Sequence, residues 1–297
     1  MIVSDIMAQT GVDCDPNRAQ HALSAIDQIL SYGALALVVG AGAWWAVRRR
    51  RDPLANAPER PNQLREDALM LTILVYLTTA VAISGIVQLA AGHTESVLAT
   101  MFVGSGAQLA GLGACLVVAA TRFEGGVRRF CLGDEGARSV SWIAITLVLT
   151  IAAIGLCPVI RDAAINITLY FAPDHEFTPH PTIKALQERT QPIGIVVMLW
   201  TGAIVIAPVA EEFFFRGLLQ TFLIRLVRNR WLAIGLASLA FGAVHLSQPH
   251  AVGALAVLGL LIGYAYERTG SLLPPIAIHA AFNFKTLIWD ALGGFPT

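Results

Sequence analysis

Glu211-Glu212-Phe213-Phe214-Phe215-Arg216 is a charged segment inside one of the most apolar stretches of a 297-residue chain. At the centre of a membrane helix, each such charge costs roughly 2.5 to 3.5 kcal/mol. Two adjacent carboxylates and an arginine therefore need to pair with one another, to face a polar cavity, or both. We interpret this segment as the core of a catalytic site within the membrane.

The composition predicts a membrane protein. Hydrophobic residues make up 56% of the chain and charged residues only 13%, with a mean hydropathy of +0.64. Soluble domains carry about 25% charged residues, so most of this chain must face lipid or packed apolar helices. We predict an all-α fold, a polytopic membrane helix bundle. The formal net charge of +0 provides no field that would attract nucleic acid.

Apolar runs of about the length needed to cross a ~30 Å hydrocarbon core recur along the chain. They are Leu30 to Val47, Leu69 to Ala91, Val97 to Ala120, Val140 to Ile160, Ile193 to Val227, Trp231 to Leu246, Ala251 to Tyr266 and Leu272 to Leu292. We therefore expect about eight transmembrane helices. Because proline lacks a backbone N–H, Pro208 is expected to bend the fifth run or divide it into two half-helices.

These runs divide the chain into four parts. We expect an exterior segment at 1–29, a membrane region of four helices at 30–160, an exterior loop at 161–192 and a catalytic membrane region at 193–292. Arginines gather in every second connection, which places both termini outside under the positive-inside rule. The four cysteines show no spacing typical of a disulfide framework or a thiolate metal site.

Three polar pairs follow one another in the last third of the chain, each with a spacing of four residues. They are Glu212 with Arg216, Phe241 with His245, and His279 with Asn283. This spacing places both members of a pair on one face of a helix. From the helical rise, Glu211, His245 and His279 lie about 21, 22 and 16 Å from the basic ends of their helices. All three motifs are therefore expected at one depth in the membrane.

Such a set of side chains is suited to peptide hydrolysis. A glutamate in a low-dielectric cavity can act as a general base, and a neighbouring histidine can share or relay the proton of a water molecule. An asparagine amide and a second imidazole can donate hydrogen bonds to a developing oxyanion. Other intramembrane protease motifs do not occur in the chain, namely the GxSG of rhomboids, the GxGD of presenilins and the HExxH of zincins.

The three motifs resemble those of the CPBP family, the CAAX protease and bacteriocin-processing enzymes, which includes the type II CAAX prenyl endopeptidases. The family pattern is EExxxR, then FxxxH, then HxxxN or HxxxD on successive membrane helices. The corresponding residues here are Glu211 and Glu212 with Arg216, Phe241 with His245, and His279 with Asn283. The resemblance covers about Ile193 to Asp290, and no motif extends it to the first 190 residues.

The resemblance implies a role for each motif residue. Glu211 and His245 would activate the water, and His279 and Asn283 would form the oxyanion hole. The supporting residues would be Glu212 and Arg216, which hold the first glutamate and its helix, and Phe241, which packs at the site. The activity implied is that of an intramembrane endopeptidase that uses no cofactor.

Two alternatives remain open at this stage. Glu211, His245 and His279 also form a two-histidine, one-glutamate set that could bind zinc with an open fourth position. The protein could instead be a non-catalytic membrane immunity or scaffold protein, in which the motifs only stabilise the bundle. A transporter is disfavoured because the polar groups are concentrated in one half of the chain rather than in two related repeats.

A site near the middle of the bilayer limits the substrate. It can reach a membrane-anchored chain, a lipidated C-terminus or a peptide drawn into the cavity. A prenylated CAAX tail and a bacteriocin leader are both candidates. The high content of Ala, Gly and Arg favours a bacterial source, so we expect a multi-pass protein of the bacterial inner membrane.

Overall fold

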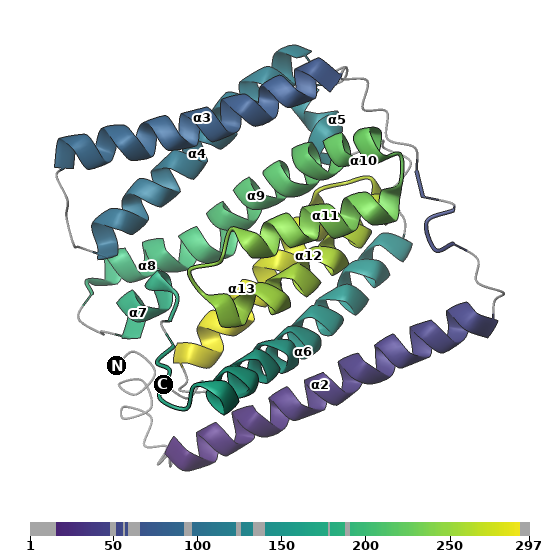
Figure 1. Cartoon of the computed structure of the whole chain (residues 1–297), viewed down its shortest axis with the longest axis vertical. Coiled ribbons are helices and arrows are strands. Elements are labelled where there is room, and N and C mark those ends of the chain that lie inside the picture. The colour runs from purple at the N-terminus through teal and green to yellow at the C-terminus, as the bar shows by residue number, and fades with distance from the viewer. Residues whose placement is uncertain are drawn as a thin grey trace.

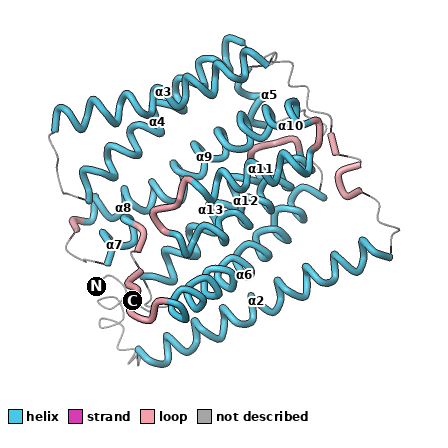
Figure 2. Tube along the Cα trace, in the orientation of Figure 1, coloured by secondary structure: helices cyan, strands magenta, loops and turns pink. Residues whose placement is uncertain are grey.

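The structure is a computed structural model that describes most of the chain. The described residues are 16–47, 52–55, 57–58, 66–91, 97–122, 126–132, 140–177, 179–187 and 191–291. They form helices and connecting loops, with no strand among them (Figure 2). The predicted all-α class is therefore confirmed.

Seven long helices and one composite helix make up the described bundle. The long helices are α2 (Pro16–Val47), α3 (Glu66–Ala91), α4 (Val97–Arg122), α6 (Val140–Phe171), α11 (Arg230–Ala243), α12 (Pro249–Thr269) and α13 (Leu273–Ala291). Short helices lie in two connections, α5 (Gly126–Leu132) and α7 (Pro181–Gln187). Within the described part of the chain, six helices are long and apolar enough to cross a membrane. Together with α11 and α13 they agree with the prediction of about eight membrane helices.

The composite helix runs from Ile193 to Val227 without a break. It consists of α8 (Ile193–Thr201), the π-helical segment η2 (Gly202–Ile206), α9 (Ala207–Glu212), the π-helical segment η3 (Phe213–Gln220) and α10 (Thr221–Val227). Pro208 does not divide it, because the proline falls in the first turn of α9. The change in hydrogen-bonding register occurs in the two π-helical segments instead.

The helices are arranged so that the C-terminal region lies between two N-terminal pairs. Figure 1 shows α3 and α4 together at one edge of the molecule and α2 with α6 at the opposite edge. The composite helix, α11, α12 and α13 lie between these pairs. The buried core of this middle layer includes Leu218, Phe241, Leu258 and Ile262, each 0% exposed. Many apolar side chains of α2 and α3 are exposed, as expected for helices that face lipid.

Two predicted boundaries differ from those of the helices. The exterior segment predicted at 1–29 overlaps α2, which begins at Pro16, and residues 1–15 lie outside the described part of the chain. The loop predicted to begin at Arg161 overlaps α6, which continues to Phe171. Arg161 and Asp162 interrupt the apolar run, but they pair with each other on the exposed helix surface at 2.7 Å. The helix can therefore continue past both charges.

Small residues bring α11 and α12 close together. A Cβ atom at Gly242 would lie 2.7 Å from the carbonyl oxygen of Val252, and one at Gly259 would lie 3.0 Å from the Cα of Ser238. In membranes, close approach of this kind contributes much of the attraction between helices. It also holds the end of α11, and the turn after it that carries His245, against α12.

Two glycine-to-alanine substitutions on α11 test this close contact. Gly242→Ala should lower the free energy of unfolding by about 1 to 3 kcal/mol, because the added methyl group meets the backbone of α12. Gly235→Ala is the matched control on the same helix, since a Cβ atom there meets nothing within 4 Å. Thermal unfolding of both variants in the same detergent measures the difference. Equal melting temperatures would contradict the close contact at Gly242.

Candidate active site

The EExxxR motif lies where the composite helix changes its winding. Glu211 and Glu212 end α9, and Arg216 lies in η3 directly after them. π-Helical turns are uncommon and occur frequently at functional sites, because the extra residue redirects the side chains around it. The two neighbouring glutamates consequently have different surroundings: the Glu211 side chain is 17% exposed, whereas that of Glu212 is 0% exposed.

Glu212 and Arg216 form a fully buried ion pair. The Arg216 Nη1 lies 3.0 Å from Glu212 Oε1 and 2.9 Å from Oε2, and the arginine side chain is 1% exposed. Its guanidinium also lies 4.7 Å from the ring centroid of Phe241, and its Nη2 donates to the carbonyl of Gly259 at 3.4 Å. The two charges therefore neutralise each other inside the bundle and connect the composite helix to α11 and α12.

His279 joins the two glutamates. Its Nδ1 lies 2.6 Å from Glu212 Oε1, and its Nε2 lies 3.9 Å from Glu211 Oε2. A carboxylate paired with arginine can only accept hydrogen bonds, so the Nδ1 of His279 carries the proton and donates. A bond at one ring nitrogen fixes the orientation of the other. Glu212 thereby directs the Nε2 of His279 toward Glu211.

His245 lies in the turn that follows α11 and is oriented by a residue of that helix. Its Nδ1 lies 2.9 Å from the backbone carbonyl oxygen of Phe241. Because that oxygen can only accept, the Nδ1 carries a proton, and in a neutral ring the Nε2 would be the acceptor. The Phe241 ring is fully buried and contacts both imidazoles, with centroid distances of 5.4 Å to His245 and 5.6 Å to His279. Phe241 is thus the spacer that separates the two histidines.

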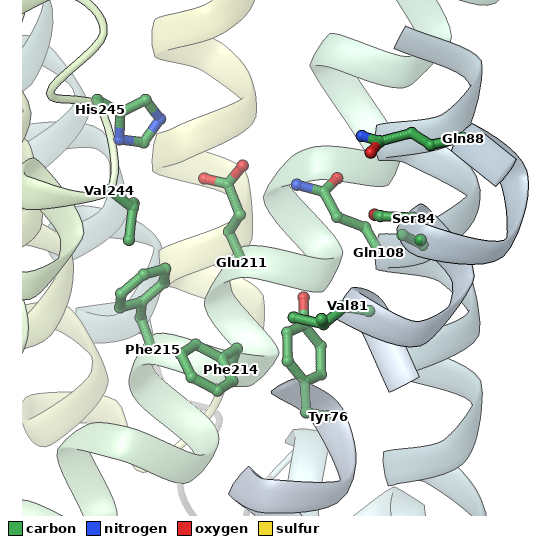
Figure 3. A pocket seen from close by; sticks show the side chains of 14 residues that line it. Tyr76, Val81, Ser84, Gln88, Gln108, Glu211, Phe214, Phe215, Val244 and His245 are labelled. Carbon is green, nitrogen blue, oxygen red and sulfur yellow. The ribbon is translucent and has the colours of Figure 1, made fainter. Parts of the chain in front are cut away.

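A cavity of about 590 Å³ adjoins two of the predicted catalytic residues. Glu211 and His245 line it, and Figure 3 shows the carboxylate and the imidazole extending toward the same space. Among the described residues, His279 and Asn283 do not line this cavity. Asn283 instead donates from its Nδ2 to the carbonyl of Ala203 in η2 at 2.8 Å. The structure therefore brings Glu211, Glu212, Arg216, Phe241, His245 and His279 together and connects Asn283 to the neighbouring turn.

A comparison with known families gives one match to this region. Residues 193–285 match the family described as Type II CAAX prenyl endopeptidase Rce1-like. Over these residues the chain is similar to a CPBP-family protease. The match includes every motif residue from Glu211 to Asn283, and the family is one of peptide hydrolases. No curated protein and no solved structure matched the chain in the corresponding searches.

The matched region, 193–285, does not enclose the cavity alone. The opposite wall comes from α3 and α4, outside the matched residues, and includes Tyr76, Ser84, Gln88, Gly104, Ala107 and Gln108. The Tyr76 ring stacks on Phe214 with centroids 4.6 Å apart, which holds α3 against η3. Sequence analysis did not single out these residues. One sequence pattern could have indicated this wall: a four-residue spacing, which places polar groups on one face of an apolar helix. The residues with this spacing are Tyr76, Ala80, Ser84 and Gln88.

The fit of a metal ion to the CPBP motifs can be judged from the same geometry. The zinc alternative requires Glu211, His245 and His279 to direct ligand atoms at one point. Among the described residues, no group of three or more His, Cys, Asp or Glu side chains is arranged to hold a metal ion. The Nδ1 atoms of both histidines are already bonded, so only their Nε2 atoms could serve as ligands.

Proposed function

We propose that this CPBP-family protein is an intramembrane endopeptidase in which Glu211 and His245 activate a water molecule. The observation that supports the proposal most directly is the different exposure of two adjacent glutamates. Glu211 faces the cavity together with His245, whereas Glu212 is sealed against Arg216 and His279. One carboxylate is placed to react and the other to hold the site in position.

The proposed reaction needs only water and protein groups. Glu211, assisted by His245, accepts one proton from a water molecule as the water oxygen bonds to the carbonyl carbon of the scissile peptide. The C–N bond then breaks, and the accepted proton passes to the departing amine. The products are a carboxylic acid, which keeps the second proton of the water molecule, and a free amine, so atoms and charges balance.

We assign the stabilisation of the oxyanion to His279 and Asn283. The amide of Asn283 carries two N–H groups, and one of them is used by Ala203. The other can donate to substrate. The Nε2 of His279 lies 3.9 Å from Glu211 Oε2, a separation that a shared water molecule can bridge. His279 can donate from Nε2 to the oxyanion when that nitrogen is protonated.

The setting indicates the class of substrate. Since the site lies among membrane helices, a soluble globular protein would have to unfold to reach it. We propose a membrane-anchored or lipidated peptide, with a prenylated CAAX tail as one candidate and a bacteriocin leader as another. We place the protein in the bacterial inner membrane.

A comparison of peptide termini tests the proposed function without presupposing a substrate. Wild type and Glu211→Gln are expressed at matched levels, and new peptide termini in the membranes are mapped by mass spectrometry. Termini present only with the wild type are expected. If the maps agree while both proteins are folded, and the cellular phenotype survives the substitution, a non-catalytic immunity or scaffold role would replace the protease.

Removal of metal distinguishes the water mechanism from the zinc alternative. We expect cleavage by the purified protein to be unchanged after incubation with a tight zinc chelator, because glutamate, histidine and asparagine supply every proposed step. The control is addition of zinc to the chelated protein. Loss of cleavage that zinc restores would assign Glu211, His245 and His279 to a metal site instead.

A further inference from the structure

We propose that the α3 and α4 wall of the cavity binds the substrate backbone next to the scissile bond, with the amides of Gln108 and Gln88 as its hydrogen-bonding groups. This inference rests on the proposed function and extends it to a part of the chain outside the matched family region. The substrate segment would lie extended between this wall and Glu211. Figure 3 shows the Gln108 amide directed from α4 toward the side of Glu211.

The polar groups of this wall form a row. Tyr76, Ser84 and Gln88 lie on one face of α3, and Gln108 lies beside them on α4. The helical rise gives about 18 Å from Tyr76 to Gln88. An extended peptide advances about 3.3 Å per residue, so the row matches roughly five residues of substrate. One end of the row is closed by the stacked rings of Tyr76 and Phe214.

The side chains of this row have no hydrogen-bond partner among the described residues. Ser84, Gln88 and Gln108 form no side-chain hydrogen bond there. Other hydroxyl groups of the same helices behave differently: Thr78 donates to the carbonyl of Leu74 at 2.7 Å, and Thr121 to that of Val117 at 2.9 Å. Ser84 and Gln108 are partly exposed and Gln88 is exposed, so their polar groups are accessible from the cavity that they line. The row is therefore suited to a polar ligand.

The charges of the cavity favour a neutral ligand. Among the described lining residues there is no lysine or arginine, and Glu211 supplies a carboxylate. A free carboxylate placed directly beside Glu211 would find no cation among these residues and would be repelled, so the segment next to the scissile bond should be uncharged. Glutamine amides offer both a donor and an acceptor, as a peptide group does. The peptide backbone satisfies both requirements.

The shape of the wall leaves room for this segment. Its helices contribute small residues, Ala80, Gly85, Gly104 and Ala107, and a Cβ atom at Gly85 or Gly104 would meet nothing within 4 Å. The cavity volume of about 590 Å³ lies within the range of small-ligand sites. Apolar side chains of Phe214, Phe215 and Val244 cover other parts of the lining and suit the apolar side chains or lipid anchor of a membrane peptide.

A binding experiment tests the wall separately from catalysis. The full chain is placed in lipid nanodiscs, and the probe is a dansyl-labelled, farnesylated CAAX-box peptide with an amidated C-terminus. We expect wild type and Glu211→Gln to bind it with similar affinity. Gly104→Leu, which fills the cavity, should weaken binding about tenfold or more. Gln108→Leu should weaken it by about three- to tenfold, the effect of one lost hydrogen bond, and Gln108→Asn should restore part of the loss.

Gly113→Leu is the matched control. Gly113 also lies on α4, a Cβ atom there meets nothing within 4 Å, and it does not line the cavity. The Gly113→Leu variant should bind the probe with the same affinity as the wild type. Equal affinities for Gly104→Leu and Gly113→Leu, or no binding to any variant, would overturn the inference. If the variants bind as expected but no cleavage depends on Glu211, the substrate-binding wall is supported and the proposed function is refuted. If cleavage depends on Glu211 but is unaffected by Gly104→Leu, the proposed function is supported and the wall is refuted.

Discussion

Replacing Arg216 by methionine should lower the free energy of unfolding by about 3 to 5 kcal/mol, the cost of removing one partner from a buried ion pair. The reason is the position of Glu212, which is 0% exposed and pairs with this arginine at 2.9 Å. Without Arg216, the carboxylate would remain charged in an apolar core or take up a proton. The measurement is unfolding in detergent, by heat or by denaturant.

An exposed arginine supplies the control for this prediction. Arg228→Met removes a charge from the exposed turn between α10 and α11 and should change stability by no more than about 0.5 kcal/mol. The double variant Glu212→Leu/Arg216→Met should be more stable than Arg216→Met, because no unpaired charge remains. It should still be inactive, since the Nδ1 of His279 has lost its acceptor. Equal stability of the single and double variants would contradict the assignment of Glu212 as the partner.

Glu211→Gln should lower the rate of peptide cleavage by about 10²- to 10⁴-fold, the contribution typical of a general base. Glutamine has nearly the same shape but cannot accept the proton of the water molecule. The melting temperature should change little, because the Glu211 side chain faces the cavity and belongs to no buried pair like that of Glu212 and Arg216. Rates are measured with a peptide identified from the comparison of membrane termini.

Glu176→Gln provides the matched control for the loss of a carboxylate. Glu176 is exposed in the connection between α6 and α7, so its replacement should leave the cleavage rate unchanged. A Glu211→Gln rate within tenfold of the wild type would show that another group activates the water. His245→Ala would then be the next variant to compare, because His245 shares the cavity with Glu211.

The sequence by itself determined the class of the fold and the contents of the site. Apolar runs of membrane length require helices, since lipid cannot satisfy backbone hydrogen bonds. The four-residue spacing of each motif predicted a common helix face for Glu212 with Arg216, for Phe241 with His245 and for His279 with Asn283. The structure differs at the second pair, because His245 lies in the turn that follows α11. Both properties depend on local periodicity, so they could be predicted before any contact between helices was known.

Only the tertiary structure decided how these faces meet. It assigned His279 to Glu212 at 2.6 Å while leaving Glu211 at the cavity, and it connected Asn283 to Ala203. It also placed the polar row of α3 opposite Glu211, a relationship for which the N-terminal half carries no motif. The physical reason is that such contacts depend on the rotation and separation of whole helices. These are set by packing at residues such as Gly242 and by the π-helical turns beside Glu211, neither of which local periodicity specifies.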